Sequence, residues 1–169
     1  LTDILKNGFL NAPFSEPYGD YSDKMLYSKI DIIDFVKGSR YSYCNTNYFL
    51  LCKIIEKVTD KSYESNLQEL IFNPLGLKNT FPYHSNTIRN LAHPIIDGQD
   101  LQGYPKKANN MLSQGSGNIV SDVYDLNKFI RALLVEKTLL KKESLNLMTD
   151  FFTYKKTKSG LGLFEETYS

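Results

Sequence analysis

Residues 41–60 read YSYCNTNYFLLCKIIEKVTD, and this stretch sets the expectations for the fold. Its apolar residues recur at helical spacing: Tyr48, Leu51, Ile55 and Val58, with Leu50 and Ile54 beside them. Such a stripe is typical of an amphipathic helix, here over about 46–59, and Asn45 or Thr46 can cap its N-terminus. The triplet Tyr43-Cys44-Asn45 precedes the helix, so a phenol and a carboxamide lie on a loop that a rigid element holds.

The rest of the chain predicts a mainly helical protein with little strand. Two short helices are expected at about 2–6 and 29–35. Longer ones are expected at about 62–71, which 73–76 ends, at about 122–134, which Ser121 caps, and at about 141–149. On the 122–134 helix, Val123, Leu126, Ile130 and Leu133 share one face. Residues 92–106 predict a small hairpin, with Asp97-Gly98 as its turn.

Composition excludes several classes of partner. The 169 residues carry 20 basic and 19 acidic side chains and are 41% apolar, which is globular. A net charge of +1 gives no bulk field that would attract nucleic acid or an anionic membrane. No apolar run approaches the roughly 18–20 residues of a membrane span, and the first residues show no signal peptide.

Neither the cysteines nor the histidines indicate a metal or cofactor site. If Cys52 lies on the helix, its Cα would be roughly 10–12 Å from that of Cys44, whereas a disulfide needs less than about 7 Å. Two free thiols are therefore expected. Cys44 is interpreted as a packed residue rather than a nucleophile, since no histidine is close in sequence. His84 and His93 are nine residues apart, with no further ligand at metal-site spacing.

Taken alone, Tyr43-Cys44-Asn45 also fits a buried aromatic residue followed by a capping asparagine. Its context, YSYCNTNYFLLCKIIEKVTDKSYESNLQELIFNPLGLKNTF, resembles the Tyr-x-Asn region of the penicillin-recognising serine hydrolases. This family includes class C β-lactamases, D-alanyl-D-alanine carboxypeptidases and related esterases and D-peptidases. A second block, GSGNIVSDVYDLNKFIRALL (115–134), is similar to the family's Gly-Gly-x-x-Ser-Thr-x-x-Asp-Leu segment, and Gly160-Leu161-Gly162 to its Tyr-Gly-Leu-Gly.

The resemblance implies acyl transfer, in which a serine attacks an amide or ester carbonyl and an acyl-enzyme is then resolved. In the family a lysine one helical turn after the serine assists. By resemblance, Tyr43 relays protons and Asn45 binds the substrate's acyl amide. A tyrosine phenol titrates near 10, and a neighbouring ammonium would move its pKa toward the useful range.

The chain departs from the family pattern in three places. None of its serines has a lysine three residues on, so the Ser-x-x-Lys nucleophile is expected before residue 1. Lys158-Ser159-Gly160 could imitate the family's Lys-Thr-Gly box, but it runs into Leu-Gly-Leu, which matches the strand entry before that box. Without nucleophile and box strand, this chain alone is expected to be inactive. Cys52 stands where the family prefers glycine.

The expected fold is therefore the helical lobe of the β-lactamase/transpeptidase-like α/β fold, mainly α with a short β-hairpin, spanning 1–169 as a single lobe. The expected substrate of the parent protein is a small peptide, β-lactam or ester, at a crevice that Tyr43, Tyr41 and Tyr48 border. The face that packs on the absent sheet could drive self-association. Resemblance places the parent in the periplasm or outside the cell. The alternative is a non-catalytic relative that binds peptides or cell-wall ligands.

Overall fold

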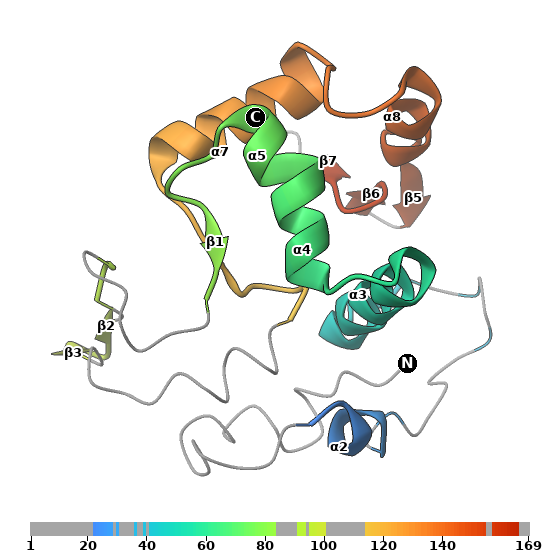
Figure 1. Cartoon of the computed structure of the whole chain (residues 1–169). Coiled ribbons are helices and arrows are strands. Elements are labelled where there is room, and N and C mark those ends of the chain that lie inside the picture. Colours follow the sequence, from blue (N-terminus) through green and yellow to red (C-terminus); the bar gives the residue numbers. More distant parts are fainter. Residues whose placement is uncertain are drawn as a thin grey trace. The chain divides into compact units, whose positions relative to one another are not determined.

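The structure is a computed structural model, and it describes residues 22–28, 30, 36, 39, 41–83, 91–93, 95–100, 114–154 and 157–165. The chain divides into two compact units. Figure 1 labels the helices and strands of both. Unit 1 comprises Leu1–Asp34, Tyr43–Glu64 and Phe81–Val120. Unit 2 comprises Phe35–Ser42, Ser65–Thr80 and Ser121–Ser169.

Unit 1 is built on the helix that the apolar stripe predicts. Helix α3 spans Asn45–Thr59, which confirms the expected range to within one residue. Its buried face carries Thr46, Phe49 and Cys52. The Phe49 ring contacts Tyr27 of helix α2 (Asp23–Ser28), with ring centroids 5.6 Å apart. The sequence did not predict α2, because a six-residue helix is too short to show a periodic stripe.

The expected cap of α3 is wrong. The N-cap position is occupied by Cys44 in extended conformation, with no side-chain cap bond, and Asn45 is already the first helical residue. Asn45 Oδ1 instead accepts a hydrogen bond from the Tyr43 hydroxyl. Thr46 lies inside the helix and is only 1% exposed. The side chains that could have capped the helix are therefore used elsewhere.

Two short antiparallel pairs complete the described part of unit 1. Strand β1 (Phe81–Pro82) pairs with β4 (Ile119–Val120), and β2 (Ile95–Ile96) pairs with β3 (Gln99–Asp100). Between β2 and β3, Asp97 and Gly98 have φ values of 50° and 76°. Positive φ at both central residues defines the tight hairpin turn that the Asp-Gly pair predicts. This part of the hairpin is confirmed, and 101–106 lie outside the described residues.

The next helical run is longer than the sequence predicts. Helix α4 (Tyr63–Leu67) continues as a π-helical turn, η2 (Gln68–Phe72), and then as α5 (Asn73–Leu75). Gly76 ends the run in left-handed conformation, with φ of 60°. The prediction stopped the helix before Pro74, because proline lacks an N–H and crowds a regular α turn. The wider π turn directly before it relieves this conflict, so the helix passes through the proline.

Unit 2 also contains the two expected C-terminal helices and an unexpected sheet. Helix α7 (Val123–Ile130) continues as η3 (Arg131–Val135), and α8 spans Lys142–Met148. Strands β5 (Phe152–Tyr154), β6 (Thr157–Ser159) and β7 (Phe164–Glu165) form a three-stranded antiparallel sheet. Apart from the strand entry that the family resemblance implies at Leu161-Gly162-Leu163, the sequence predicted no strand here, because strands this short lack a measurable alternation. The expected helix at 2–6 and almost all of that at 29–35 lie outside the described residues.

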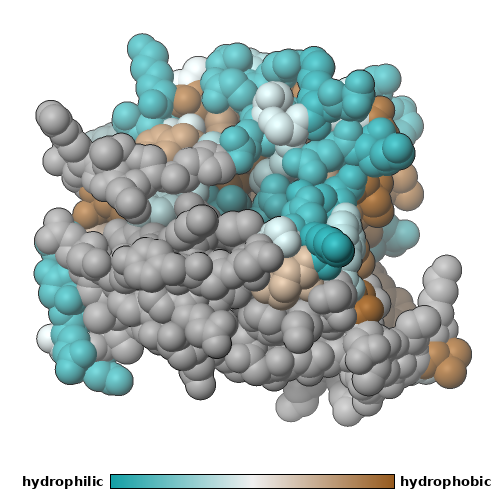
Figure 2. Space-filling model, turned by 60° about the horizontal axis from the view of Figure 1, so that its bottom comes forward, coloured by the Kyte–Doolittle hydropathy of each residue, from teal (hydrophilic) through white to brown (hydrophobic). Residues whose placement is uncertain are grey.

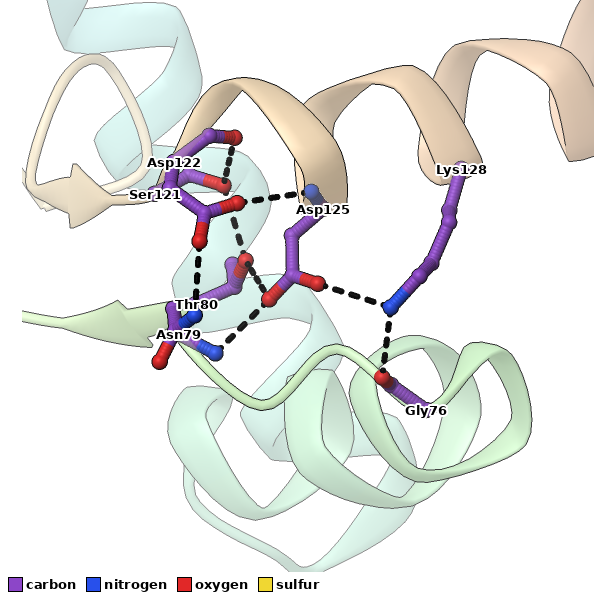
Figure 3. A network of polar contacts seen from close by, with 7 residues as sticks. All are labelled: Gly76, Asn79, Thr80, Ser121, Asp122, Asp125 and Lys128. Carbon is purple, nitrogen blue, oxygen red and sulfur yellow. Dashed lines mark hydrogen bonds and ion pairs between the residues drawn. The ribbon is translucent and has the colours of Figure 1, made fainter.

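A buried carboxylate joins α7 to the loop after α5 (Figure 3). Asp125 is 2% exposed, and its Oδ2 accepts hydrogen bonds from the Asn79 N–H at 2.7 Å and the Thr80 hydroxyl at 3.1 Å. Its Oδ1 lies 3.0 Å from Lys128 Nζ, which also donates to the Gly76 carbonyl. Burial raises the pKa of Asp125, but these hydrogen bonds outweigh it and hold the pKa below its usual value.

The cap of α7 differs from the expected one. Asp122 is the N-cap, and its Oδ1 accepts from the Asp125 N–H at 2.8 Å. The predicted cap, Ser121, instead lies with its hydroxyl 2.8 Å from the Thr80 hydroxyl (Figure 3). Asp122 also accepts from the Asn79 side-chain amide at 2.6 Å. Ser121 and Asp122 thus contact Thr80 and Asn79, which lie more than forty residues away in the sequence. A local cap pattern cannot predict such partners.

The predicted apolar face of α7 and η3 is only partly covered. Leu133 is 4% exposed, whereas Val123, Leu126 and Ile130 are 74%, 52% and 42% exposed. Figure 2 shows one face of the molecule, where hydrophobic side chains lie in patches among hydrophilic ones. Among the described residues, no helix is both long enough and apolar enough to cross a bilayer.

Candidate active site

The phenol and the carboxamide of the Tyr-x-Asn triplet lie together at the N-terminus of α3. The Tyr43 hydroxyl donates to Asn45 Oδ1 at 3.1 Å. Tyr43 is 43% exposed and precedes the N-cap, whereas Asn45 occupies the first helical position and is half-buried. This argues against the plain interpretation of the triplet as a buried aromatic residue followed by a cap. The geometry presents a phenol oxygen and an amide group side by side on a rigid element.

Tyr48 lies against the Tyr43 ring. The two ring centroids are 5.8 Å apart and the rings are tilted by 41°. Tyr41, the other residue expected to border the crevice, contacts Phe164 edge-on, with centroids 6.5 Å apart, in unit 2. The structure therefore places one of these two aromatic side chains directly beside the candidate catalytic tyrosine.

Gly115 brings the second sequence block onto the same helix. It lies in the turn 114–117 with φ of 78°. A Cβ added there would lie 2.8 Å from the Tyr48 carbonyl oxygen and in collision with Cys52 Sγ. Only glycine accepts both the backbone conformation and this approach. The two blocks that carry the family resemblance thus meet at Tyr48 and Cys52.

Cys52 is a packed residue and not a nucleophile. The side chain is 2% exposed, and burial raises the pKa of its thiol to about 11. It shares a hydrogen bond with the Tyr63 side chain, whose pKa burial raises to about 12. Cys44 is likewise buried, at 3% exposure, and both cysteines are free thiols as expected. The sulfur that replaces the family's glycine fills the space against Gly115.

Lys53 and Glu56 of α3 form an ion pair. Lys53 Nζ lies 2.9 Å from Asp23 and 2.9 Å from Glu56, and Glu56 also accepts from the Tyr63 N–H. Burial lowers the pKa of Lys53, but the two carboxylates outweigh it and raise the pKa above its usual value. This ammonium ties α2 to α3 and is committed to that role.

The remaining sequence candidates fall into two groups. Lys158-Ser159-Gly160 begins on strand β6, where Lys158 forms an exposed ion pair with Glu165 of β7. Whether this segment corresponds to the family's Lys-Thr-Gly box or leads into the strand entry before that box stays a prediction. His93 Nδ1 lies 2.7 Å from Asp100 across the β2–β3 hairpin, and His84 lies outside the described residues. Within the described ranges, no three His, Cys, Asp or Glu side chains gather as a metal site.

The family model described as Beta-lactamase matches residues 20–165. The chain belongs to the beta-lactamase family. It is 30% identical over 146 residues to a D-aminopeptidase of Brucella anthropi, a match that covers 84% of this chain and 28% of the relative. It is 32% identical over 126 residues to a teichoic acid D-alanine hydrolase of Staphylococcus aureus, covering 73% and 31%.

Solved structures agree with the beta-lactamase family assignment. A D-stereospecific amidohydrolase from Streptomyces sp. superposes with a TM-score of 0.71 at 27% identity, over 99% of this chain and 54% of the other. The fold is therefore β-lactamase/transpeptidase-like, of the penicillin-recognising serine hydrolase type. The chain spans less than a third of the length of the curated relatives named above.

The sequence identified Tyr43 and Asn45 as candidate site residues, but it did not predict the packing of Gly115 on the helix that carries Asn45. Nothing in the pattern of 115–117 indicated that Gly115 packs on Tyr48 and Cys52. The usable signal was the departure at Cys52 together with the glycine-rich turn, since a glycine often marks a close backbone approach.

Proposed function

We propose that residues 1–169 form the helical lobe of a serine acyl-hydrolase, in which Tyr43 is the proton-relaying residue and Asn45 binds the substrate's acyl amide. The observation that carries the proposal is the 3.1 Å hydrogen bond between the Tyr43 hydroxyl and Asn45 Oδ1, on a half-exposed tyrosine of a chain in the beta-lactamase family.

The proposed chemistry is a two-step acyl transfer. A serine hydroxyl attacks the substrate carbonyl, its proton leaves through the Tyr43 phenol, and the amine or alcohol leaving group receives that proton. Water then resolves the acyl-enzyme by the reverse sequence of proton transfers. No Ser-x-x-Lys lies among residues 1–169, so the chain by itself is proposed to be inactive.

We propose an amide or ester of a D-amino acid as the substrate. Two named relatives act, by their names, on D-amino-acyl groups: a D-aminopeptidase and a teichoic acid D-alanine hydrolase. The similar Streptomyces structure is of a D-stereospecific amidohydrolase. These names support a D-configured acyl group over a β-lactam as the physiological substrate, while a penicillin remains a suitable acylating probe.

The test uses the full-length protein, extended to include its Ser-x-x-Lys segment, with residues 1–169 as the matched control. The full-length protein should be labelled by a fluorescent penicillin and should hydrolyse D-alanine p-nitroanilide faster than the L-enantiomer. The control should do neither. A full-length protein that binds a D-amino acid amide without labelling or turnover would refute the enzymatic proposal and favour the non-catalytic binding module.

A further inference from the structure

We propose that Tyr48 is a positioning residue for Tyr43, and that the Gly115 turn is the backbone support that holds Tyr48 in place. The inference rests on the proposed function of Tyr43 and adds to it the residues that fix the orientation of the phenol. It follows from three contacts within unit 1: Tyr43 with Asn45, Tyr43 with Tyr48, and α3 with Gly115.

The first contact restrains the Tyr43 oxygen. The hydrogen bond to Asn45 Oδ1, 3.1 Å long, fixes the position of the phenol oxygen and does not by itself set the tilt of the ring. Because Tyr43 is 43% exposed, burial alone does not hold the side chain. A contact made by the ring itself therefore bears directly on where the phenol points.

The second contact is made by the Tyr43 ring. The Tyr48 ring lies 5.8 Å from the Tyr43 ring, at a tilt of 41°. Separations of about 4.5–7 Å with tilted rings are the favoured range for aromatic pairs. Tyr48 lies three residues after Asn45 on α3, so one turn of helix carries both groups that restrain the phenol.

The third contact fixes Tyr48 itself. The carbonyl oxygen of Tyr48 faces Gly115 so closely that an added Cβ would lie 2.8 Å away. Cys52, one helical turn further, presents its buried sulfur to the same glycine. Backbone and side chain of α3 therefore both pack closely against the Gly115 turn, which restrains the segment that carries Tyr48.

The inference predicts a defined kinetic pattern in the full-length enzyme. Tyr48→Leu removes the ring, and the kcat for D-alanine p-nitroanilide should fall about 10- to 100-fold, because a displacement near 1 Å can cost about a hundredfold. KM should change little, because in this proposal Tyr48 acts through Tyr43 and not on the substrate. Tyr48→Phe keeps the ring and should stay within about threefold of the wild type. Tyr124→Leu, at a position 77% exposed, is the matched control and should change nothing.

A structural readout tests the same claim on residues 1–169, where no turnover is needed. With ¹³Cζ-labelled tyrosine, the Tyr43 resonance is assigned as the one that Tyr43→Phe removes. Its chemical shift should move in Tyr48→Leu and stay in place in Tyr48→Phe and Tyr124→Leu. If Tyr48→Leu does not fold, Tyr48→Met takes its place, because it fills the space with a flexible chain and no ring.

The outcomes separate the two proposals. Unchanged turnover in Tyr43→Phe would refute the proposed function, whereas the Tyr43 resonance would still test the positioning role. A large loss in Tyr43→Phe together with wild-type kcat and an unmoved resonance in Tyr48→Leu would overturn the positioning role alone. Equal losses in Tyr48→Phe and Tyr48→Leu would also overturn it, since the hydroxyl rather than the ring would then matter.

Discussion

Replacing Gly115 by alanine tests the contact between this glycine and helix α3. The residue has φ of 78°, where an L side chain costs about 1–2 kcal/mol. The new Cβ would also meet Tyr48 O at 2.8 Å and Cys52 Sγ. Forcing an extra carbon into a packed site costs about 1–3 kcal/mol. The two effects together predict a loss of about 2–5 kcal/mol in the free energy of unfolding.

The assay is urea unfolding of residues 1–169, followed by circular dichroism at 222 nm, and two glycines provide controls. Gly76 also has a positive φ, of 60°, but an added Cβ would meet nothing within 4 Å. Gly76→Ala should therefore lower the free energy of unfolding by only about 1–2 kcal/mol. Gly117→Ala meets nothing within 4 Å and should be near neutral. Adding Cys52→Ala to Gly115→Ala should recover part of the loss, because one of the two clashing atoms is gone. If Gly115→Ala is no worse than Gly76→Ala, the close approach does not exist.

Three further predictions concern the described side chains. Asp122→Ala should lower the free energy of unfolding by about 0.5–2 kcal/mol through loss of the α7 cap, and Asp122→Asn should restore most of it, as urea midpoints will show. Since the pKa of Asp125 is lowered in the folded state, its contribution to stability is present above about pH 3.8 and is lost as the pH falls through the folded pKa. The difference in thermal midpoint between wild type and Asp125→Asn should therefore shrink from pH 6 to pH 3, and a constant difference would contradict this. With a thiol pKa of about 11, about one Cys52 in a thousand is ionised at pH 8, so iodoacetamide should modify it only after unfolding; rapid modification of the folded chain would disprove its burial.

The sequence predicted α3, α8 and the β2–β3 hairpin well. Helices α3 and α8 and the Asp97-Gly98 hairpin follow from local physics: a stripe of apolar residues at helical spacing, or two residues that accept positive φ. The proximity of Tyr43 and Asn45 could be predicted for the same reason, because two residues in one turn at a helix start have little freedom to separate.

What the sequence did not predict depends on distant partners. Ser121 has a side chain suited to a helix cap, yet its hydroxyl lies 2.8 Å from that of Thr80, which is 41 residues away in the sequence. The apolar pattern of α7 identified a face, but it could not tell that Leu133 is buried while the preceding positions on that face are exposed. The packing of Gly115 on Tyr48 and Cys52 was missed because these residues are far apart in the sequence.

The β5–β6–β7 sheet was missed because strands of two or three residues carry too few positions to show alternation. In a chain of this family, the interior helices are therefore easier to predict than the short strands between and after them.

The central claim is most directly tested by the acylation rate constant of the full-length protein with fluorescent penicillin, compared between wild type and Tyr43→Phe. Phenylalanine keeps the ring that packs on Tyr48 and removes only the oxygen that bonds to Asn45. A proton-relaying tyrosine predicts a fall of about a hundredfold or more with an unchanged circular dichroism spectrum. Acylation of Tyr43→Phe at the wild-type rate would contradict the account.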